Sequence, residues 1–286
     1  MKRLLRWFVT GVGILVALVA VGYAVVYVIS ERVLARHYDV PAVALVIPSD
    51  PASIAEGRRL SVLRGCFGGC HGKGAEGAVL FDEPLIARLV APNLTRAVRK
   101  YGDAELATII RHGLRPDGRS VVVMPSEEFT VLTDADLSRI VAYLKSLPVA
   151  DGPDAEIRLG PLGRIGVAFG QYRTAAQIIA EAAPPPDTEQ PQAAAGRYLA
   201  RTTCAHCHGT DLRGSSNPDF TAPALQIVAA YSPEAFRQFL RTGVALGGRE
   251  LRVMSGVARK QLHDLTDDEI AALYSYLHAI PYGTEH

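Results

Sequence analysis

The longest hydrophobic stretch of the chain lies near its N-terminus. Residues 7–29 form a run of 23 residues with no charged side chain. A helix rises about 1.5 Å per residue, so a run of this length crosses a hydrocarbon core of about 30 Å. Lys2, Arg3 and Arg6 precede the run, and basic residues keep the short end of such a helix in the cytoplasm. The pattern predicts a transmembrane anchor over residues 1–30, with the rest of the chain on the exterior side.

The alternative interpretation of this stretch is a cleaved signal peptide. Signal peptides have an apolar core of about 7–15 residues and a small-x-small cleavage site close behind it. The run at residues 7–29 is longer, and no such site follows closely. We therefore favour an uncleaved, single-pass anchor with lipid around residues 7–29.

Two segments with helical periodicity lie at matching places in the two halves of the chain. Residues 132–148 and 265–281 each begin with Leu-Thr-Asp, continue with apolar residues at helical period, and end in a proline 16 residues after the leucine. Thr133 and Thr266 stand at N-cap positions and are followed by acidic residues. Each segment is therefore predicted to be a capped helix that closes its half.

Each half also opens with a helical segment that carries a glycine. These segments cover residues 54–60 and 195–199, and both run into a cysteine motif. Gly57 and Gly196 have no side chain, so each permits a second helix to cross closely.

A further matched spacing lies between the opening and closing helices. Gly113 precedes Met124 by 11 residues, and Gly243 precedes Met254 by the same number. The chain therefore contains an internal repeat, which predicts two domains of similar helical fold. The predicted domains cover residues 53–149 and 193–286.

Two segments outside these domains are rich in proline. Residues 31–52 contain three prolines and are predicted to be a tether. Residues 150–192 are predicted to be a Pro-rich linker, although their middle is apolar, at Leu162, Ile165 and Phe169 among others. We expect this apolar part to pack against a domain. Contact with the membrane surface is the alternative, and no lysine-rich face accompanies the segment to favour it.

All four cysteines belong to two motifs that end in histidine. Cys204 and Cys207 are three residues apart and His208 follows directly, which is the spacing that attaches a haem covalently and places a histidine on its iron. A structural zinc site or a redox disulfide is the alternative for a cysteine pair. The haem spacing is distinct from the zinc spacings, so it is the favoured interpretation.

The first motif has one residue more between its cysteines. Cys66 and Cys70 are four residues apart, and His71 again follows directly. Gly68 and Gly69 can adopt backbone angles that absorb the added residue as a local bulge. We therefore expect two covalently bound haem c groups, one in each half.

Methionine and proline complete the candidate site. Besides the initiator, the chain has only Met124 and Met254, and both fall between the haem motif and the closing helix. A thioether there can ligate the sixth position of the iron; the alternative is an apolar filler of the core. Pro92 and Pro223 also correspond, and each can present a carbonyl to the far nitrogen of its histidine. A simple turn proline is the alternative.

With these residues the sequence resembles membrane-anchored dihaem c-type cytochromes built from two class I domains. That family includes cytochrome subunits of bacterial membrane dehydrogenases and, more loosely, the dihaem subunit of some haem-copper oxidases. The resemblance covers nearly the whole chain and is sharpest over residues 85–148. The matching residues there are Ala91-Pro92-Asn93-Leu94-Thr95, Met124-Pro125, Phe129 and Leu132-Thr133-Asp134-Ala135-Asp136.

The resemblance implies an all-α fold, with an N-terminal transmembrane helix followed by two class I cytochrome c domains. It implies haem attachment at Cys66, Cys70, Cys204 and Cys207, and axial ligation by His71, Met124, His208 and Met254. It also implies the bacterial inner membrane, with the haem domains on the periplasmic side. The chain departs from the pattern at the extra residue after Cys66, at Ser126, where many relatives have an aromatic residue, and at Ser255, where relatives have proline.

These features predict a relay of single electrons. The donor would be a membrane oxidoreductase complex or dehydrogenase, and the acceptor an oxidase or a soluble cytochrome. The formal net charge is only +1, and basic and acidic residues nearly balance in both predicted domains, so no nucleic-acid partner is expected. Two other classes compete: a dihaem peroxidase-like oxidoreductase, which needs an open sixth position on one iron, and a structural haem subunit of a larger complex. The matched methionines favour the relay.

Overall fold

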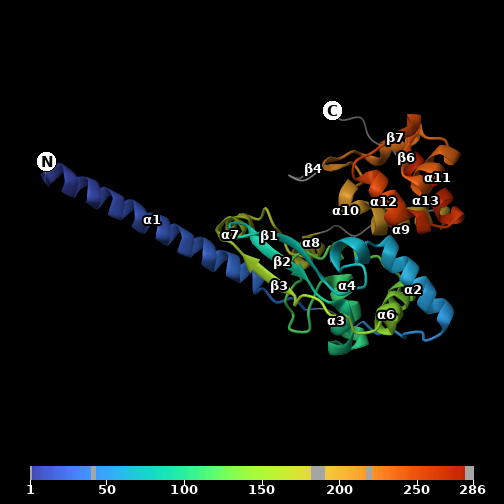
Figure 1. Ribbon diagram of the computed structural model, residues 1–286, viewed down its shortest axis with the longest axis horizontal. Helices are drawn as coiled ribbons and strands as arrows, with labels where there is room; N and C mark the ends of the chain where they lie inside the picture. Colours follow the sequence, from blue (N-terminus) through green and yellow to red (C-terminus); the bar gives the residue numbers. More distant parts are fainter. Residues whose placement is uncertain (1, 40–42, 182–190, 217–220, 281–286) are drawn as a thin grey trace.

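The structure is a computed structural model that describes residues 2–39, 43–181, 191–216 and 221–280. Most of these residues are helical, as predicted, and two helical domains follow a long N-terminal helix (Figure 1). The Pro-rich end of the predicted linker, at residues 182–190, and the proline at position 281 lie outside the described residues.

Helix α1 (Lys2–Leu34) corresponds to the predicted anchor. Its most apolar 18-residue window has a mean hydropathy of 2.7, and none of that window is buried against the rest of the protein. Among the described residues it is the one helix that is long and apolar enough to cross a membrane. It continues past residue 30 into the segment predicted to be a tether.

The remainder of that segment contacts the first domain. The backbone N–H of Tyr38 donates to the carbonyl of Gly118 (3.0 Å). Val43, Leu45 and Ile47 pack against the first core, and alternate residues of an extended chain share one face. The alternating apolar residues therefore make this segment part of the first domain's packing.

The first domain is built around the two helices that the repeat predicts. Helix α2 begins after Asp50, whose side chain accepts the N–H of Ser53 (2.9 Å), and helix α6 begins after Thr133, whose hydroxyl accepts the N–H of Asp136 (3.1 Å). The elements of this domain are α2 (Pro51–Leu63), β1 (Ala78–Glu83), β2 (Ala87–Ala91), α3 (Leu94–Lys100), α4 (Asp103–His112), α5 (Ser126–Phe129), α6 (Asp134–Ser146), β3 (Glu156–Leu159), α7 (Pro161–Ala168) and α8 (Ala175–Glu181).

A three-stranded antiparallel sheet is the element that the all-α expectation did not include. Its order is β1-β2-β3, with Ala78 opposite Ala91 and Ala87 opposite Leu159. Strand β3 and helices α7 and α8 come from the predicted linker, so the apolar part of that segment packs on the first domain, as expected. Helix α7 also packs against α1 (Figure 1).

The second domain repeats the helical plan. Its closing helix follows Thr266, which forms a reciprocal capping box with Glu269: the Thr266 hydroxyl accepts the N–H of Glu269 (3.1 Å), and the Glu269 carboxylate accepts the N–H of Thr266 (2.7 Å). The helices and strands are α9 (Pro191–Leu199), α10 (Ala205–His208), β4 (Ser215–Ser216), β5 (Thr221–Ala222), α11 (Pro233–Thr242), β6 (Val244–Ala245), β7 (Arg249–Glu250), α12 (Met254–Lys260) and α13 (Asp267–Ala279). Single 3₁₀ turns are found at Leu225–Ala230, Leu246–Gly248 and Leu262–Asp264.

Close helix crossings at two glycines are confirmed. A Cβ at Gly57 would stand 1.9 Å from the carbonyl oxygen of Arg139 in α6, and a Cβ at Gly196 would stand 2.3 Å from the carbonyl oxygen of Ala272 in α13. Both distances are far below van der Waals contact, so only glycine permits the opening and closing helices to approach in this way. The crossing holds the cysteine motif, which follows the opening helix, against the closing helix of its domain.

We expect Gly57→Ala to destabilise the first domain, because its methyl group must push α2 away from backbone atoms of α6. Overpacking of this kind costs about 1–3 kcal/mol or more. The measurement is the midpoint of chemical unfolding of the detergent-solubilised protein. Gly256→Ala in α12 is the matched control, since a Cβ there meets nothing within 4 Å. Equal midpoints for the two variants would contradict the role assigned to the crossing.

Candidate haem sites

The first cysteine motif forms an irregular turn, Cys66–Cys70, between α2 and His71. Phe67 is extended, at φ −110° and ψ 154°, and Gly68 has a φ of +81°, in the left-handed region that favours glycine. The N–H of His71 nevertheless donates to the carbonyl of Cys66 (3.1 Å) and closes the turn. The added residue is thus accommodated as a bulge, with Gly68 carrying the unusual angle.

The second motif is a more regular helical turn. A wide turn at Ala200–Cys204 leads directly into α10, which contains Cys207 and His208. Cys204, Cys207 and His208 therefore follow one another along nearly continuous helical backbone. All four cysteines of the chain are free thiols in the structure, which leaves both pairs available for attachment.

Each motif histidine is held by the carbonyl of the predicted proline. Nδ1 of His71 lies 2.9 Å from the carbonyl oxygen of Pro92, and Nδ1 of His208 lies 2.8 Å from that of Pro223. A carbonyl can only accept a hydrogen bond, so Nδ1 must carry the proton and Nε2 must present its lone pair. Burial lowers the pKa of both imidazoles and favours this neutral form.

The backbone that brings each proline to its histidine is the same in both domains. Gly77 and Gly214, each six residues after the motif histidine, have φ values of +88° and +97°, and their N–H groups donate to the carbonyls of His71 and His208 (2.9 Å in both). A Cβ at either glycine would lie within 2.8 Å of a carbonyl oxygen in the strand before the proline. The glycines therefore allow the histidine loop to lie flat against that strand. Their equal spacing was visible in the sequence, but our sequence reasoning did not use it.

A thiol pair beside an imidazole with a free Nε2 fits a covalently attached haem. The imidazole is already in the tautomer that binds a metal, and the carbonyl behind it is the usual partner of a metal-bound histidine. Among the described residues, no hydrogen bond to Nε2 of His71 or His208 is found. Both histidines are buried, and neither Nε2 is used by a contact within the described part of the chain, which suits a bound group.

The two methionines lie half-buried at the edge of their domain cores. Met124 precedes α5 and Met254 begins α12, so both stand between the histidine loop and the closing helix. A serine follows each one closely: Ser126 donates to the carbonyl of Ile109, and Ser255 donates to that of Gly243. These bonds tie each methionine segment to the end of the preceding helix. The serines noted as departures thus have an equivalent structural role in the two domains.

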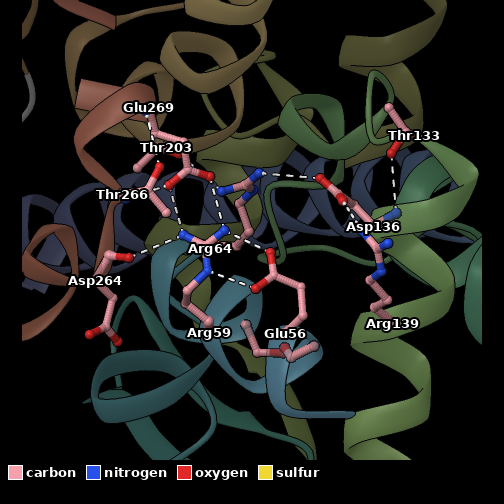
Figure 2. Close-up of polar contacts among 12 residues, drawn as sticks. Glu56, Arg59, Arg64, Thr133, Asp136, Arg139, Thr203, Asp264, Thr266 and Glu269 are labelled. Atoms are coloured by element: carbon pink, nitrogen blue, oxygen red, sulfur yellow. Dashed lines mark hydrogen bonds and ion pairs between the residues drawn. The ribbon is translucent and has the colours of Figure 1, made fainter. Parts of the chain in front are cut away.

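Arg64 lies between the two cysteine motifs. Sequence reasoning did not identify this residue. Its side chain is 1% exposed, Nη1 lies 3.3 Å from the hydroxyl of Thr203, and the guanidinium lies over the ring of Tyr198. Nη2 is 3.9 Å from a carboxylate oxygen of Asp136 (Figure 2). The same oxygen accepts a hydrogen bond from the Tyr198 hydroxyl. Nε and Nη2 have no hydrogen-bond partner among the described residues. This is a buried cation whose compensation is incomplete.

The charge of Arg64 acts on both motifs. Burial raises the pKa of the Cys66 and Cys204 thiols to about 12, and the Arg64 guanidinium opposes that rise at each of them. One positive charge is therefore felt at the first cysteine of both domains.

Two further contacts join the domains around Arg64. Arg59 in α2 forms a bidentate pair with Glu269 in α13, at 2.7 and 2.9 Å, and its other edge is held by Glu56 (Figure 2). Glu128, which is mostly buried, lies 3.0 Å from Nδ1 of His206 inside the second motif. Burial raises the pKa of Glu128, while the hydrogen bond that His206 donates to the Glu128 carboxylate raises the pKa of His206. These pairs fix the orientation of one motif relative to the other.

Two helical domains that each set two thiols beside a carbonyl-oriented imidazole define the class of c-type cytochromes. The family model described as "Cytochrome C oxidase, cbb3-type, subunit III" matches residues 52–144 and 191–277. The two segments make up more than half of the chain, so the chain belongs to this family. Covalently bound haem c and electron transport follow from that membership, and the helical domains are cytochrome c domains.

The curated relatives are cytochrome subunits of dehydrogenases. The chain is 24% identical to the fructose dehydrogenase cytochrome subunit of Gluconobacter japonicus, over 82% of this chain and 54% of that protein. It is 24% identical to the cytochrome c subunit of the quinone alcohol dehydrogenase of Gluconacetobacter polyoxogenes, over 84% and 58%. It is 28% identical to the gluconate 2-dehydrogenase cytochrome c subunit of Pantoea cypripedii, over 67% and 50%. The chain thus spans about half the length of the curated relatives it matches.

Proposed function

We propose that this chain relays single electrons through two haem c groups, as a membrane-anchored cytochrome subunit of a dehydrogenase complex. The observation that best supports this is the duplicated imidazole geometry. His71 and His208 are both buried, both in the tautomer with Nε2 free, and both held by a proline carbonyl. A duplicated site of this kind suits a relay, because an electron that enters one domain has a second acceptor in the same chain.

The chain supplies the same set of groups in each domain. Cys66 and Cys70, and in the second domain Cys204 and Cys207, attach the haem. His71 and His208 would each supply a nitrogen ligand to the iron, and Met124 and Met254 would each supply a sulfur ligand. A haem c bound by these residues would supply one-electron chemistry between ferrous and ferric iron, and a thioether ligand would raise its potential. The serine bonds behind each methionine and the carbonyl behind each histidine hold the ligands still during that change.

The domain interface gives the relay a fixed geometry. Arg59 and Glu269 join the opening helix of one domain to the closing helix of the other, and Glu128 reaches the second cysteine motif. These contacts therefore hold the two cysteine motifs at a fixed separation and orientation.

The partners follow from the relatives and the anchor. A membrane dehydrogenase is the proposed donor, since the matched relatives are cytochrome subunits of dehydrogenases. An oxidase or a soluble cytochrome is the proposed acceptor. We place α1 in the bacterial inner membrane and the haem domains on the periplasmic side, because the basic residues Lys2, Arg3 and Arg6 precede the apolar run.

Mass spectrometry of the purified chain should show two haems, each bound through two thioether bonds, including the widened first motif. The bulge at Gly68 keeps His71 bonded to the Cys66 carbonyl, so the turn remains closed despite its extra residue. A chain mass with a single haem would contradict the proposed pair.

Redox titration should show two low-spin centres without reactivity towards peroxide, whereas a high-spin centre would favour the peroxidase-like alternative.

Met124→Leu and Met254→Leu should each convert one of the two centres to a high-spin state with a lower potential. Leucine keeps the volume of the side chain but has no sulfur for the iron. Absorption spectra and redox titration measure both changes. Val123→Ala and Val253→Ala are the controls, because these exposed valines directly precede the methionines. Unchanged spectra in a leucine variant would exclude that methionine as a ligand.

Arg64→Gln should lower the potentials of both centres together, because a positive charge between the motifs disfavours the more positive ferric state. At an effective dielectric constant of about 20, removal of one such charge shifts a one-electron potential by tens of millivolts, on the order of 1 kcal/mol. Arg139→Gln is the control: it also faces Asp136 but is 39% exposed, and water screens its charge. A shift confined to one centre would show that Arg64 does not act on both motifs.

A further inference from the structure

We propose that the outward face of α7 and the turn after it form a second membrane contact, seated in the lipid headgroup region beside α1. This surface, the α7 face, consists of Leu162, Ile165, Phe169 and Tyr172. The inference rests on the proposed crossing of the bilayer by α1 and is independent of electron transfer.

Helix α7 is fastened to the outer end of the anchor. The guanidinium of Arg164 lies 3.9 Å from the centroid of the Tyr27 ring. Nη1 of Arg164 also contacts Ser30 Oγ at 3.0 Å and Glu31 Oε1 at 2.7 Å. These contacts hold α7 beside the last turns of the apolar run, and Figure 1 shows α7 next to α1 where that helix meets the first domain.

The depth of α7 follows from the anchor. If residues 7–29 fill the hydrocarbon core, residues 27–31 stand at its outer boundary. Aromatic residues mark the same level, with Trp7 at one end of the run and Tyr23 and Tyr27 at the other. A helix fixed to Tyr27 and Glu31 therefore lies at the height of the headgroups.

The side chains of α7 suit a helix that lies at the height of the headgroups. Leu162, Ile165 and Phe169 follow one another by three and four residues, so they share one helix face. Leu162 is 53% exposed and Phe169 is 75% exposed, and Tyr172, just after the helix, is 56% exposed. The opposite face is buried, at Gly163 and Val167. The ring of Tyr172 packs over Gly166 beside the exposed stripe. An exposed apolar stripe on a helix that is already anchored by its other face indicates an interfacial contact.

Exposed basic residues lie on, or just after, two elements that contact α7. Arg32 and Arg36 extend from the end of α1, and Arg158 precedes α7 in β3; all three are exposed. Sequence reasoning favoured packing because no lysine-rich face accompanied the apolar segment. The fold supplies arginines on the neighbouring elements instead, which suits the anionic headgroups of a bacterial membrane. One face of α7 packs against the protein, and the α7 face contacts the membrane.

A single-cysteine experiment tests the position of the α7 face. The full-length Phe169→Cys variant is placed in nanodiscs of phosphatidylcholine and phosphatidylglycerol, one chain per disc, and reacted with a water-soluble polyethylene glycol maleimide. Ile227→Cys is the matched control, because Ile227 is 52% exposed on the second domain, away from α1. Each rate is divided by the rate for the same variant in denaturant. Peptide mapping reads the labelled position, and the haem absorption spectrum confirms that each variant is folded.

The thiol at position 169 should react about tenfold more slowly than the thiol at 227, because lipid excludes the reagent and disfavours the thiolate. Leu162→Cys, on the same face, should behave in the same way and replaces Phe169→Cys if that variant fails to fold. Equal rates at 169 and 227 would overturn the inference. Protection that develops only when a dehydrogenase partner is added would also overturn it, in favour of a protein contact. Labelling of Cys66, Cys70, Cys204 or Cys207 would contradict the proposed haem attachment and leave the result for residue 169 intact.

Discussion

The hydrogen bond from an imidazole Nδ1–H to a proline carbonyl is the interaction on which the candidate site depends. A free histidine exchanges between two tautomers and rotates about two bonds, so only part of its population offers Nε2 in a given direction. The bonds from His71 to Pro92 and from His208 to Pro223 remove that freedom. A backbone carbonyl keeps the ligand neutral, unlike a carboxylate, which adds a charge behind the metal. The glycines at positive φ in the surrounding loops place each proline carbonyl beside its imidazole.

The second constraint is the contact between the two domains. Arg64 is buried at that contact with unpaired N–H groups. Burial of an incompletely paired charge lowers the stability of the fold. Nearby, the more exposed Arg59 forms complete pairs with Glu56 and Glu269. Arg59 thus has the character of an orienting pair, and Arg64 that of a fixed charge between the two cysteine motifs. The difference lies in burial and in the geometry of the partners, since both are arginines of the same helix region.

Local signals in the sequence predicted much of this arrangement. The caps at Thr133 and Thr266 and the spacing of the cysteine motifs are decided by neighbouring residues, and the crossing glycines Gly57 and Gly196 were found from their matching places in the repeat. Each of these features is present in the structure. The three-stranded sheet escaped prediction because β3 is added from a segment read as linker, about 70 residues after the strand it pairs with. Its short strands carry no strong alternation of their own.

The position of Arg64 could not be predicted for a related reason. Its burial depends on Thr203 and Tyr198, which are distant in sequence and belong to the other domain. Nothing in the local pattern around Arg64 separates it from the exposed arginines of the same chain. The pairing of Glu128 with His206 has the same origin. Features that recur in both domains, such as the caps and the crossing glycines, were accessible from the repeat, whereas contacts between the domains required the fold.

Successive contacts join the anchor to the first domain and the first domain to the second. Helix α1 is joined to the first domain by Arg164 and by the Tyr38–Gly118 bond, so the domain cannot turn freely about the end of the anchor. The second domain is held to the first by Arg59 and Glu269. Each link restricts rotation, and their combination sets the height and orientation of both cysteine motifs relative to the end of α1. Since electron transfer between separate proteins uses small and weak contacts, a fixed presentation of the sites lets such a contact work without a large interface.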